Sequence, residues 1–370
     1  MAASTLTEVA RLAGVSPATA SRVLNGSARI PGKDIADRVR QAAESLGYIP
    51  NAQAQGLAKS SSGLIGLIVH DIADPYFSAI ARGVQEAARE QRKMVLLAST
   101  EGAPASEKEA VAAFAARRAD SIVIAGSRMS RPEDVEGNAE LAAELDRYCR
   151  NGGQVAVVGH AVVGAATEEG YHVVQVPNEE LAAQLASELA ATREGEFVII
   201  GGPEGLLTSD DRIRGFQQGL SAAGRPAAEV LRTSFNRSGG FDAGLAIAAR
   251  IKAARPGGAA PSDDRPAPAA PPAAAPAPLC IFAVNDVMAI GAAAALRSQG
   301  LRIPRDATVA GFDDIETLRD FRPALSTVHL PLEEIGRQAA RSAAGRDGDG
   351  AAPSPVTGKV TLRRSTETVA

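Results

Sequence analysis

The chain opens with TLTEVARLAGVSPATASRVLNG at residues 5–26, and this stretch predicts two short helices joined by a tight turn. Thr5 and Glu8 form a capping-box pattern, because each side chain can accept a hydrogen bond from the other residue's backbone N–H. Gly14 can adopt the left-handed angles of the turn. Ser16 then predicts the N-cap of the second helix, with Pro17 at its first position, where a missing N–H costs nothing.

Apolar residues recur at helical spacing on the inner side of both helices. These inner residues are Leu6, Val9, Ala10 and Ala13 in the first helix, and Ala20, Val23 and Leu24 in the second. The second helix leaves an outward face of Pro17, Ala18, Thr19, Ser21 and Arg22. Small side chains beside one arginine suit the second helix of a helix-turn-helix, which reads the DNA major groove.

Two segments complete this head. A third helix is predicted from Ile35, Val39, Ala42 and Leu46, and it would end at Gly47 and close a three-helix core. The following segment, YIPNAQAQGLA at residues 48–58, is uncharged and too weakly apolar to form a core. Alone in water it should be a poor helix.

The motifs L-x-x-VA-x-x-AGVS-x-x-T-x-SRVLN (residues 6–25) and Y-x-PNA-x-A-x-x-L (residues 48–57) occur here in order. By these motifs the chain resembles the lactose/galactose repressor (LacI/GalR) family of bacterial transcription factors. The resemblance implies a homodimeric repressor that binds a near-palindromic operator in double-stranded DNA. It also implies a small-molecule effector, most simply a carbohydrate, and no cofactor or metal.

Arg22 is our candidate for base reading, because its guanidinium can donate two hydrogen bonds to guanine O6 and N7. A phosphate contact or a solvated surface position is the alternative. The resemblance makes Leu57 a lever that wedges into the central base step from the minor groove of bent DNA. Ordinary linker packing is the alternative. The predicted DNA-binding set is Thr5, Leu6, Ser16, Pro17, Ala18, Thr19, Ser21, Arg22, Asn25, Asn51, Ala54 and Leu57.

Composition and charge agree with a DNA-binding head on a regulatory body. The 370 residues suffice for two or three domains. The first 62 hold seven Lys/Arg against four Asp/Glu, although the whole chain has a net charge of −4. Two distant cysteines fit no metal spacing and are expected to be reduced, buried thiols. Neither a leader nor a long apolar run is found, so we expect a cytoplasmic protein with no membrane span.

After residue 63, continuous apolar strands alternate with helices, which predicts parallel sheets covered on both faces. The expected fold is therefore an all-α helix-turn-helix head with a hinge helix, followed by an α/β body of two doubly wound lobes. Ligands bind near the carboxyl ends of such strands. The resemblance implies a periplasmic-binding-protein-like body in which the chain crosses between the lobes three times.

The domain boundaries follow from these expectations. The head is predicted at 1–49, the hinge and linker at 50–62 and the body at 63–370. Within the body, the resemblance places the crossings near residues 160, 290 and 322, so the first lobe is expected at about 63–160 and 291–321, and the second at about 161–290 and 322–366. Residues 256–278 hold eight of the 22 prolines and predict an extended surface insertion.

The resemblance also supplies a predicted effector-binding set. Asp74, Tyr76 and Phe77 follow the first strand, where the two rings could stack on a ligand or instead pack the next helix. Arg212 could bind hydroxyls or a carboxylate, or form a surface salt bridge. The complete set is Asp74, Tyr76, Phe77, His160, Arg212, Phe235 and Asp286. His160 stands where the family often has aspartate, which leaves open a neutral sugar, an anionic effector or none.

Catalysis is not predicted, and no catalytic residue is assigned. The four histidines lie in no ligand-spaced motif, and neither a Gly-x-Ser-x-Gly stretch nor a P-loop is present. Two readings compete with an effector-controlled repressor. One is a cytosolic ligand-binding protein without DNA function, and the other is a DNA-binding regulator without an effector.

Overall fold

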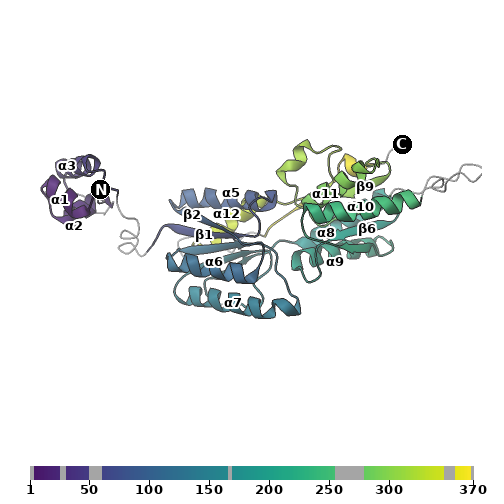
Figure 1. The fold of residues 1–370 in the computed structure, drawn as a ribbon, viewed down its shortest axis with the longest axis horizontal. Helices are drawn as coiled ribbons and strands as arrows, with labels where there is room; N and C mark the ends of the chain where they lie inside the picture. The colour runs from purple at the N-terminus through teal and green to yellow at the C-terminus, as the bar shows by residue number, and fades with distance from the viewer. Residues whose placement is uncertain are drawn as a thin grey trace, which may run out of the picture. The chain divides into compact units, whose positions relative to one another are not determined.

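The computed structural model describes residues 4–25, 31–49, 61–165, 169–254, 279–345 and 355–367 (Figure 1). The chain divides into two compact units, residues 1–64 with 117–120, and residues 65–116 with 121–370. The predicted insertion at 256–278 lies outside the described residues, as does the predicted hinge except for residues 61 and 62. The head boundary at residue 49 therefore stays a prediction.

The head is the predicted three-helix unit. It consists of α1 (Leu6–Ala13), α2 (Pro17–Leu24) and α3 (Lys33–Ser45). The Thr5–Glu8 capping box is present, the Ser16 side chain accepts from the Thr19 N–H, and Gly14 has a φ of 65°. On α3 the core position belongs to Ala36 and not to Ile35, because Ala36, Val39 and Ala43 share the buried face.

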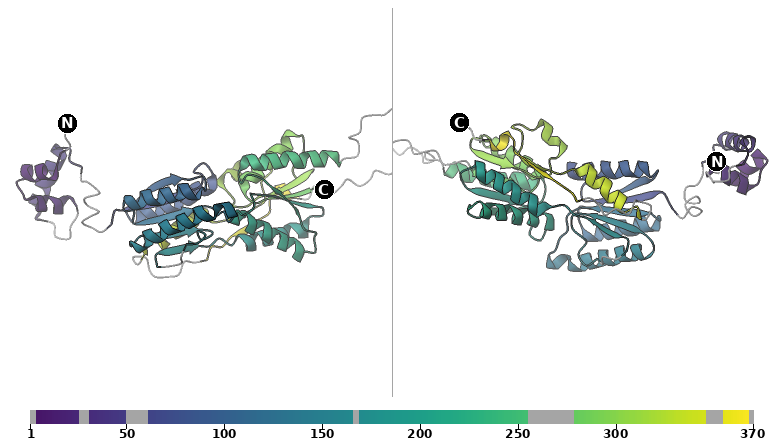
Figure 2. Two further views of the ribbon diagram at one scale, coloured as in Figure 1. Left: turned by 60° about the horizontal axis from the view of Figure 1, so that its bottom comes forward. Right: turned by 180° about the vertical axis from the view of Figure 1, so that it is seen from behind.

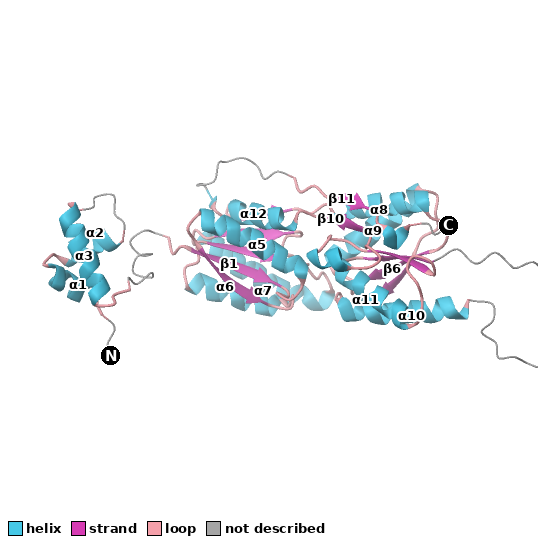
Figure 3. Cartoon of the chain, turned by 90° about the horizontal axis from the view of Figure 1, so that it is seen from above, coloured by secondary structure: helices cyan, strands magenta, loops and turns pink. Residues whose placement is uncertain are grey.

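The first lobe of the body is a five-stranded sheet in the order β2-β1-β3-β4-β5. Its strands are β1 (Leu64–Val69), β2 (Met94–Ser99), β3 (Ser121–Ala125), β4 (Gln154–Val158) and β5 (Tyr171–Val174). The pairs β1–β3, β3–β4 and β4–β5 are parallel. The helices are α5 (Pro75–Glu90), α6 (Pro104–Ala116) and α7 (Val135–Arg150), with α5 on one face and α6 and α7 on the other (Figure 3).

The second lobe is a four-stranded parallel sheet in the order β7-β6-β8-β9. Its strands are β6 (Phe197–Gly201), β7 (Glu229–Arg232), β8 (Leu279–Ala283) and β9 (Ala307–Ala310). Figure 1 shows α8 (Asn178–Thr192) and α9 (Leu207–Ala222) on one face and α10 (Arg237–Ala253) and α11 (Asp286–Ser298) on the other. The head and the two parallel α/β lobes confirm the predicted fold class.

The C-terminal region links the two lobes. The antiparallel pair β10 (Thr327–His329) and β11 (Lys359–Thr361) joins the second lobe, where β9 makes a bridge from Ala310 to Ser326. Between these strands, α12 (Leu332–Ser342) returns to the first lobe and lies beside α5 (Figure 2). A Cβ on Gly336 would lie only 2.1 Å from the Ile80 carbonyl oxygen, so the two helix backbones touch.

The predicted lobe boundaries at 160, 290 and 322 are wrong. β5 pairs with β4, so the first crossing follows Val174. The segment 291–321 belongs to the second lobe, since β9 pairs with β8 and α11 packs beside α10. The chain returns to the first lobe only after His329. A strand's own sequence does not encode which of two similar sheets it joins, because both offer an apolar parallel neighbour.

Among the helices of the described segments, none combines the length and apolar character that a membrane crossing requires. Cys280 is buried as expected, whereas Cys149 is only half-buried.

Candidate DNA-binding helix and inter-lobe site

The outward face of α2 is as predicted. Pro17, Ala18 and Arg22 are exposed, and Thr19 and Ser21 are half-buried. Ser16 Oγ lies 2.9 Å from Thr19 Oγ1, and Asn25 Nδ2 donates to Ser21 Oγ at 2.8 Å. These hydrogen bonds orient the small polar groups around the helix.

Thr5 and Leu6 lie at the start of α1, where their side chains stabilise the helix and the head core. Thr5 Oγ1 accepts from the Glu8 N–H at 3.3 Å, and Leu6 packs against the head core. The Thr5 backbone N–H is used as well, since it donates to Glu8 Oε2 at 2.8 Å. The predicted contacts Asn51, Ala54 and Leu57 lie outside the described residues.

In the body, Arg212 is the centre of a buried polar cluster. Only 2% of the residue is exposed. Its Nε donates to Asn178 Oδ1 at 2.9 Å, Nη1 to the Val284 carbonyl oxygen at 2.7 Å and Nη2 to Asp313 Oδ1 at 2.8 Å. The guanidinium also lies 3.9 Å from the centre of the Phe312 ring. The alternative of a surface salt bridge is therefore excluded.

Two buried carboxyl groups, Asp313 and Asp286, lie close to this arginine. Burial raises the pKa of Asp313 to about 7, although Arg212 opposes the rise. Burial, followed by the nearby charge of Asp313, raises the pKa of Asp286 well above its ordinary value. Asp313 also has a φ of 115°, a strained value for a residue with a Cβ.

Asp313→Asn is expected to flatten the pH dependence of stability between about pH 4 and pH 7. The pKa of an aspartate in the unfolded chain is about 3.9, whereas the pKa of Asp313 in the folded protein is about 7. The stability contributed by the protonated group is thus complete below the lower value and lost as pH rises through the higher one. Urea unfolding over a pH series measures this slope. The exposed Asp320→Asn variant is the control, and a parent-like slope in Asp313→Asn would contradict the assignment.

Asp286, a predicted effector contact, is engaged by protein groups in this structure. It is fully buried, and both oxygens are used internally. Thr327 Oγ1 donates to Oδ1 at 2.7 Å, and the Ile315 N–H donates to Oδ2 at 3.0 Å. Asn285 caps α11 and turns the next residue inward. Asp286 therefore positions the loop after β9.

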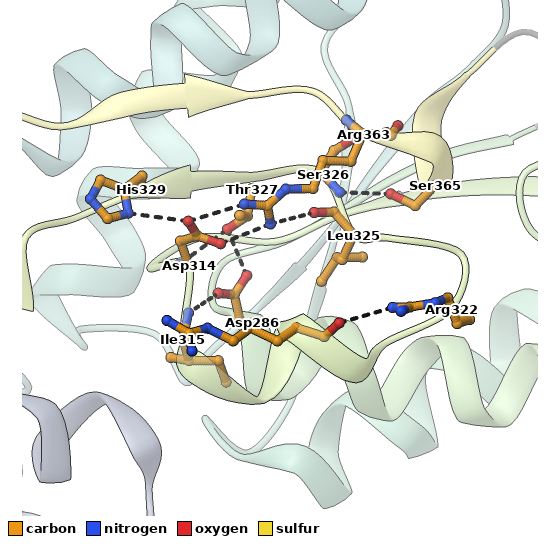
Figure 4. A network of polar contacts seen from close by, with 11 residues as sticks. Asp286, Asp314, Ile315, Arg322, Leu325, Ser326, Thr327, His329, Arg363 and Ser365 are labelled. Carbon is orange, nitrogen blue, oxygen red and sulfur yellow. Dashed lines mark hydrogen bonds and ion pairs between the residues drawn. The ribbon is translucent and has the colours of Figure 1, made fainter.

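Figure 4 shows how that loop is tied to the C-terminal strands. Asp314 lies between His329 and Arg363. Its carboxylate accepts from Arg363 Nη1 at 2.8 Å and Nη2 at 3.1 Å, while His329 Nδ1 is 3.1 Å from Oδ2. The preceding residue, Asp313, donates its N–H to the Val328 carbonyl oxygen at 2.9 Å, so the loop is bound to β10, which leads directly to the crossing into α12.

Tyr76 of the first lobe lies within electrostatic range of the arginine cluster. Tyr76 is half-buried, its pKa is raised by burial, and the charges of Asp313 and Arg212 also act on it. Asp74 accepts from the Tyr76 N–H at 2.9 Å and caps α5. Phe77 instead packs into the first-lobe core. This agrees with the alternative that its ring packs the helix and does not stack on a ligand. The structure thus brings Tyr76 and Asp74 toward Arg212.

His160 and Phe235 occupy other parts of the inter-lobe boundary. His160 Nε2 lies 2.7 Å from Asp211 Oδ2, an interaction that joins the end of β4 to α9. Although partial burial acts to raise it, His160 and Arg214 hold the pKa of Asp211 below its ordinary value. Phe235 is half-buried against the second-lobe core. A Cβ on Gly202 would approach its ring to 2.9 Å.

The predicted set omitted two features. Asp313, the ion-pair partner of Arg212, was only a weaker candidate from the sequence and was left out of the complete set, although its position directly after an apolar strand was a usable signal. The second feature is Arg128, which pairs through Nη1 with Glu107 Oε2 while both side chains are almost fully buried. Its sequence neighbourhood, Ser127-Arg128-Met129, carries no recognisable motif, so only the fold reveals it. Among the described residues, no group of three or more potential metal ligands occurs.

Comparison with family models covers almost the whole chain. Residues 5–51 match the model for bacterial regulatory proteins of the lacI family. Residues 62–246 match the model for periplasmic binding proteins and the sugar binding domain of the LacI family. Residues 186–366 match a periplasmic binding protein-like domain.

Comparison with individual proteins agrees with the family models. The HTH-type transcriptional repressor PurR of Vibrio vulnificus (strain CMCP6) is 26% identical, over 91% of this chain and 90% of its own length. The ribose operon repressor of Halalkalibacterium halodurans is 28% identical, over 91% of this chain and 88% of its own length. The crystal structure of the lac repressor dimer bound to operator and the anti-inducer ONPF matches with a TM-score of 0.77 at 21% identity. That match covers 99% of this chain and 100% of the other, and it shows a shared fold.

Proposed function

Because the chain belongs to the LacI family of bacterial regulatory proteins, we propose that it is an effector-controlled transcriptional repressor. A homodimer binds a near-palindromic operator in double-stranded DNA in the bacterial cytoplasm. A small molecule, a sugar or sugar derivative, binds between the lobes and changes the affinity for that operator. Proteins of this family are regulators and not enzymes, so no catalytic residue is assigned.

One observation carries the proposal. The same chain combines a helix-turn-helix whose second helix exposes Ala18 and Arg22 with a body in which polar groups of both lobes contact one another, His160 with Asp211 and Ser127 with Thr208. Such a body can change shape when a ligand favours one arrangement of the lobes. Operator binding and ligand binding are then coupled, and each changes the affinity for the other.

The head supports a division between base reading and phosphate binding. Arg22 is exposed on α2 and can reach a base edge in the major groove. Ser16, Thr19, Ser21 and Asn25 surround it with hydroxyl and amide groups, which bind phosphates and set the register. Pro17 and Ala18 offer only small apolar contacts, such as to a thymine methyl group.

Leu57→Ala is expected to weaken operator binding by about 10- to 100-fold and leave effector binding unchanged. In the proposed mechanism, two copies of Leu57 wedge into the central base step of a bent operator, and alanine is too short to hold that bend. Gel-shift titration on straight and pre-bent operator duplexes measures the effect, with Ala58→Ser as the neighbouring control. Equal operator affinity for Leu57→Ala and the parent would contradict the lever role.

The first lobe also offers a surface for the second copy. β2 is the outer strand of its sheet, and Met94 and Leu97 on it are 66% and 47% exposed. Apolar side chains on an unpaired strand edge are a common place of association. This edge supports a homodimer that places two heads on one operator.

The test of the proposed function begins with the full-length protein on its own genomic DNA. Sites recovered by mapping are then made as duplexes and compared with scrambled duplexes in gel shifts. Sequence-dependent binding, altered by a metabolite linked to the neighbouring genes, is the expected result. A protein with no sequence preference would be a ligand-binding protein only. A protein whose operator binding responds to no metabolite would be a regulator without an effector.

A further inference from the structure

Buried polar atoms without a hydrogen-bond partner gather at one edge of the first lobe. Three of the eight such side-chain atoms in the described residues are Arg128 Nε, Arg128 Nη2 and His160 Nδ1, while two more, His70 Nε2 and Glu107 Oε1, face each other at 3.5 Å. His70 follows β1, Arg128 follows β3 and His160 follows β4, while Glu107 lies in the first turn of α6. The strands are parallel, so these residues share the carboxyl edge of the sheet, where α/β folds bind ligands.

Arg128 is the most informative of these residues. It is 3% exposed, and Nη1 donates to Glu107 Oε2. Its Nε and Nη2 atoms, which form the opposite edge of the guanidinium, have no partner in the described residues. Those two N–H groups make a fork that matches the two oxygens of a carboxylate or phosphate. Burying such a fork without an acceptor is costly, so the site favours an occupant.

The charge of Glu107 is divided between Arg128 and His70. Glu107 is shared, because His70 Nε2 lies 3.5 Å from Oε1 on the side away from Arg128's contact. Burial acts to raise the pKa of Glu107, but Arg128 and then His70 hold it below its ordinary value. Glu107 therefore anchors one edge of Arg128 and does not cover the other.

The guanidinium group of Arg212, in contrast to that of Arg128, already donates hydrogen bonds from all three of its nitrogen atoms. Its Nε, Nη1 and Nη2 all have acceptors within the second lobe. Of these two buried guanidinium groups, Arg128 is the one with an open donor pair.

The backbone at Arg128 lies on the boundary between the lobes. Its carbonyl oxygen accepts from the Leu207 N–H at 2.9 Å, and Ser127 Oγ accepts from the Thr208 N–H at 3.2 Å. Both donors belong to α9 of the second lobe. A group held by Arg128 would therefore act directly on the contacts that join the lobes.

We propose that Arg128 receives a negatively charged group of the effector, a carboxylate or a phosphate, at the first-lobe edge of the inter-lobe site. The inference rests on the proposed function and specifies the chemical class of its effector. That effector is an acidic small molecule, such as a sugar phosphate or a sugar acid, and not a neutral sugar.

Inorganic phosphate and acetate are the probes, each added to the full-length protein at matched ionic strength against sodium chloride. At about 50 mM, an anion with a dissociation constant of about 5 mM should raise the Tm of the body by about 2–3 °C. The probe that shifts the Tm more distinguishes a phosphate from a carboxylate. A parent protein that responds to neither anion overturns the proposal.

The decisive variant is the double substitution Glu107→Gln/Arg128→Gln, which removes both members of the buried ion pair and leaves neither charge alone. It should lose at least about tenfold in affinity for the anion, as measured by calorimetry. Arg147→Gln, which removes a guanidinium that is 63% exposed in the same lobe, should behave like the parent. An anion response in the double variant equal to that of the parent overturns the proposal.

A separate measurement of operator affinity distinguishes failure of the proposed function from failure of the anion site at Arg128. Without added anion, the parent and the Arg147→Gln variant should bind a mapped operator equally, because neither the head nor the proposed anion site is changed. Absence of operator binding in the parent would refute the proposed function, while the anion titration would still report on Arg128.

Discussion

Replacing Arg212 with methionine is expected to lower the free energy of unfolding of the body by about 3–5 kcal/mol. Arg212 and Asp313 are 2% and 4% exposed, and their side chains are joined at 2.8 Å. Methionine keeps much of the volume over Phe312 but leaves Asp313 buried without an opposite charge. Urea unfolding at about pH 9, where Asp313 with its pKa of about 7 is charged in the parent, measures the loss by circular dichroism.

A double variant separates the charge from the packing. Arg212→Met/Asp313→Asn removes both charges and should recover most of the lost stability. Arg214→Met is the matched control, since its side chain is 53% exposed in the same helix, and it should change stability by less than about 1 kcal/mol. A similar loss in Arg212→Met and Arg214→Met would show that the buried pair has no special role.

Replacing Arg22 with alanine is expected to weaken operator binding by about 2–6 kcal/mol in the dimer, because each guanine fork contributes roughly 1–3 kcal/mol. The loss should appear mainly on the preferred operator. Non-specific DNA, which is bound through phosphates, should lose much less. Gel-shift titrations on both duplexes at fixed salt measure the two losses.

Arg40→Ala is the control for the loss of one positive charge. Its side chain is 57% exposed on α3 and donates to Asp37 at 2.9 Å. It should reduce binding to both duplexes by similar small factors. If Arg22→Ala also weakened both duplexes equally, Arg22 would be a phosphate contact, and the base-reading assignment would be wrong.

The head was the most predictable part of the chain. Capping, turn and core patterns lie within a few residues of one another, so local sequence determines them. The capping box at Thr5, the turn at Gly14 and the exposed Arg22 all follow from that stretch. Only the exact buried face of α3 differed, at Ile35 and Ala36.

The inter-lobe site was predicted in part. Arg212 and Tyr76 were found through family motifs, and the structure brings them together. Phe77 and Asp286 belong to the same motifs, but they are turned into the interior. A motif places a residue at the end of a strand, whereas neighbouring elements decide whether its side chain meets the other lobe.

The sequence by itself determined the helix-turn-helix, the alternation of strands and helices, and the family, because each depends on local periodicity or on a short motif. Tertiary structure alone decided three further matters. It assigned β5, β9 and α12 to their lobes, and it joined Asp313 to Arg212. It also buried Arg128 against Glu107 with one edge of its guanidinium unpaired. These depend on which distant segments become neighbours, and the free energy of a buried charge is set by those neighbours and not by the residues beside it in the chain.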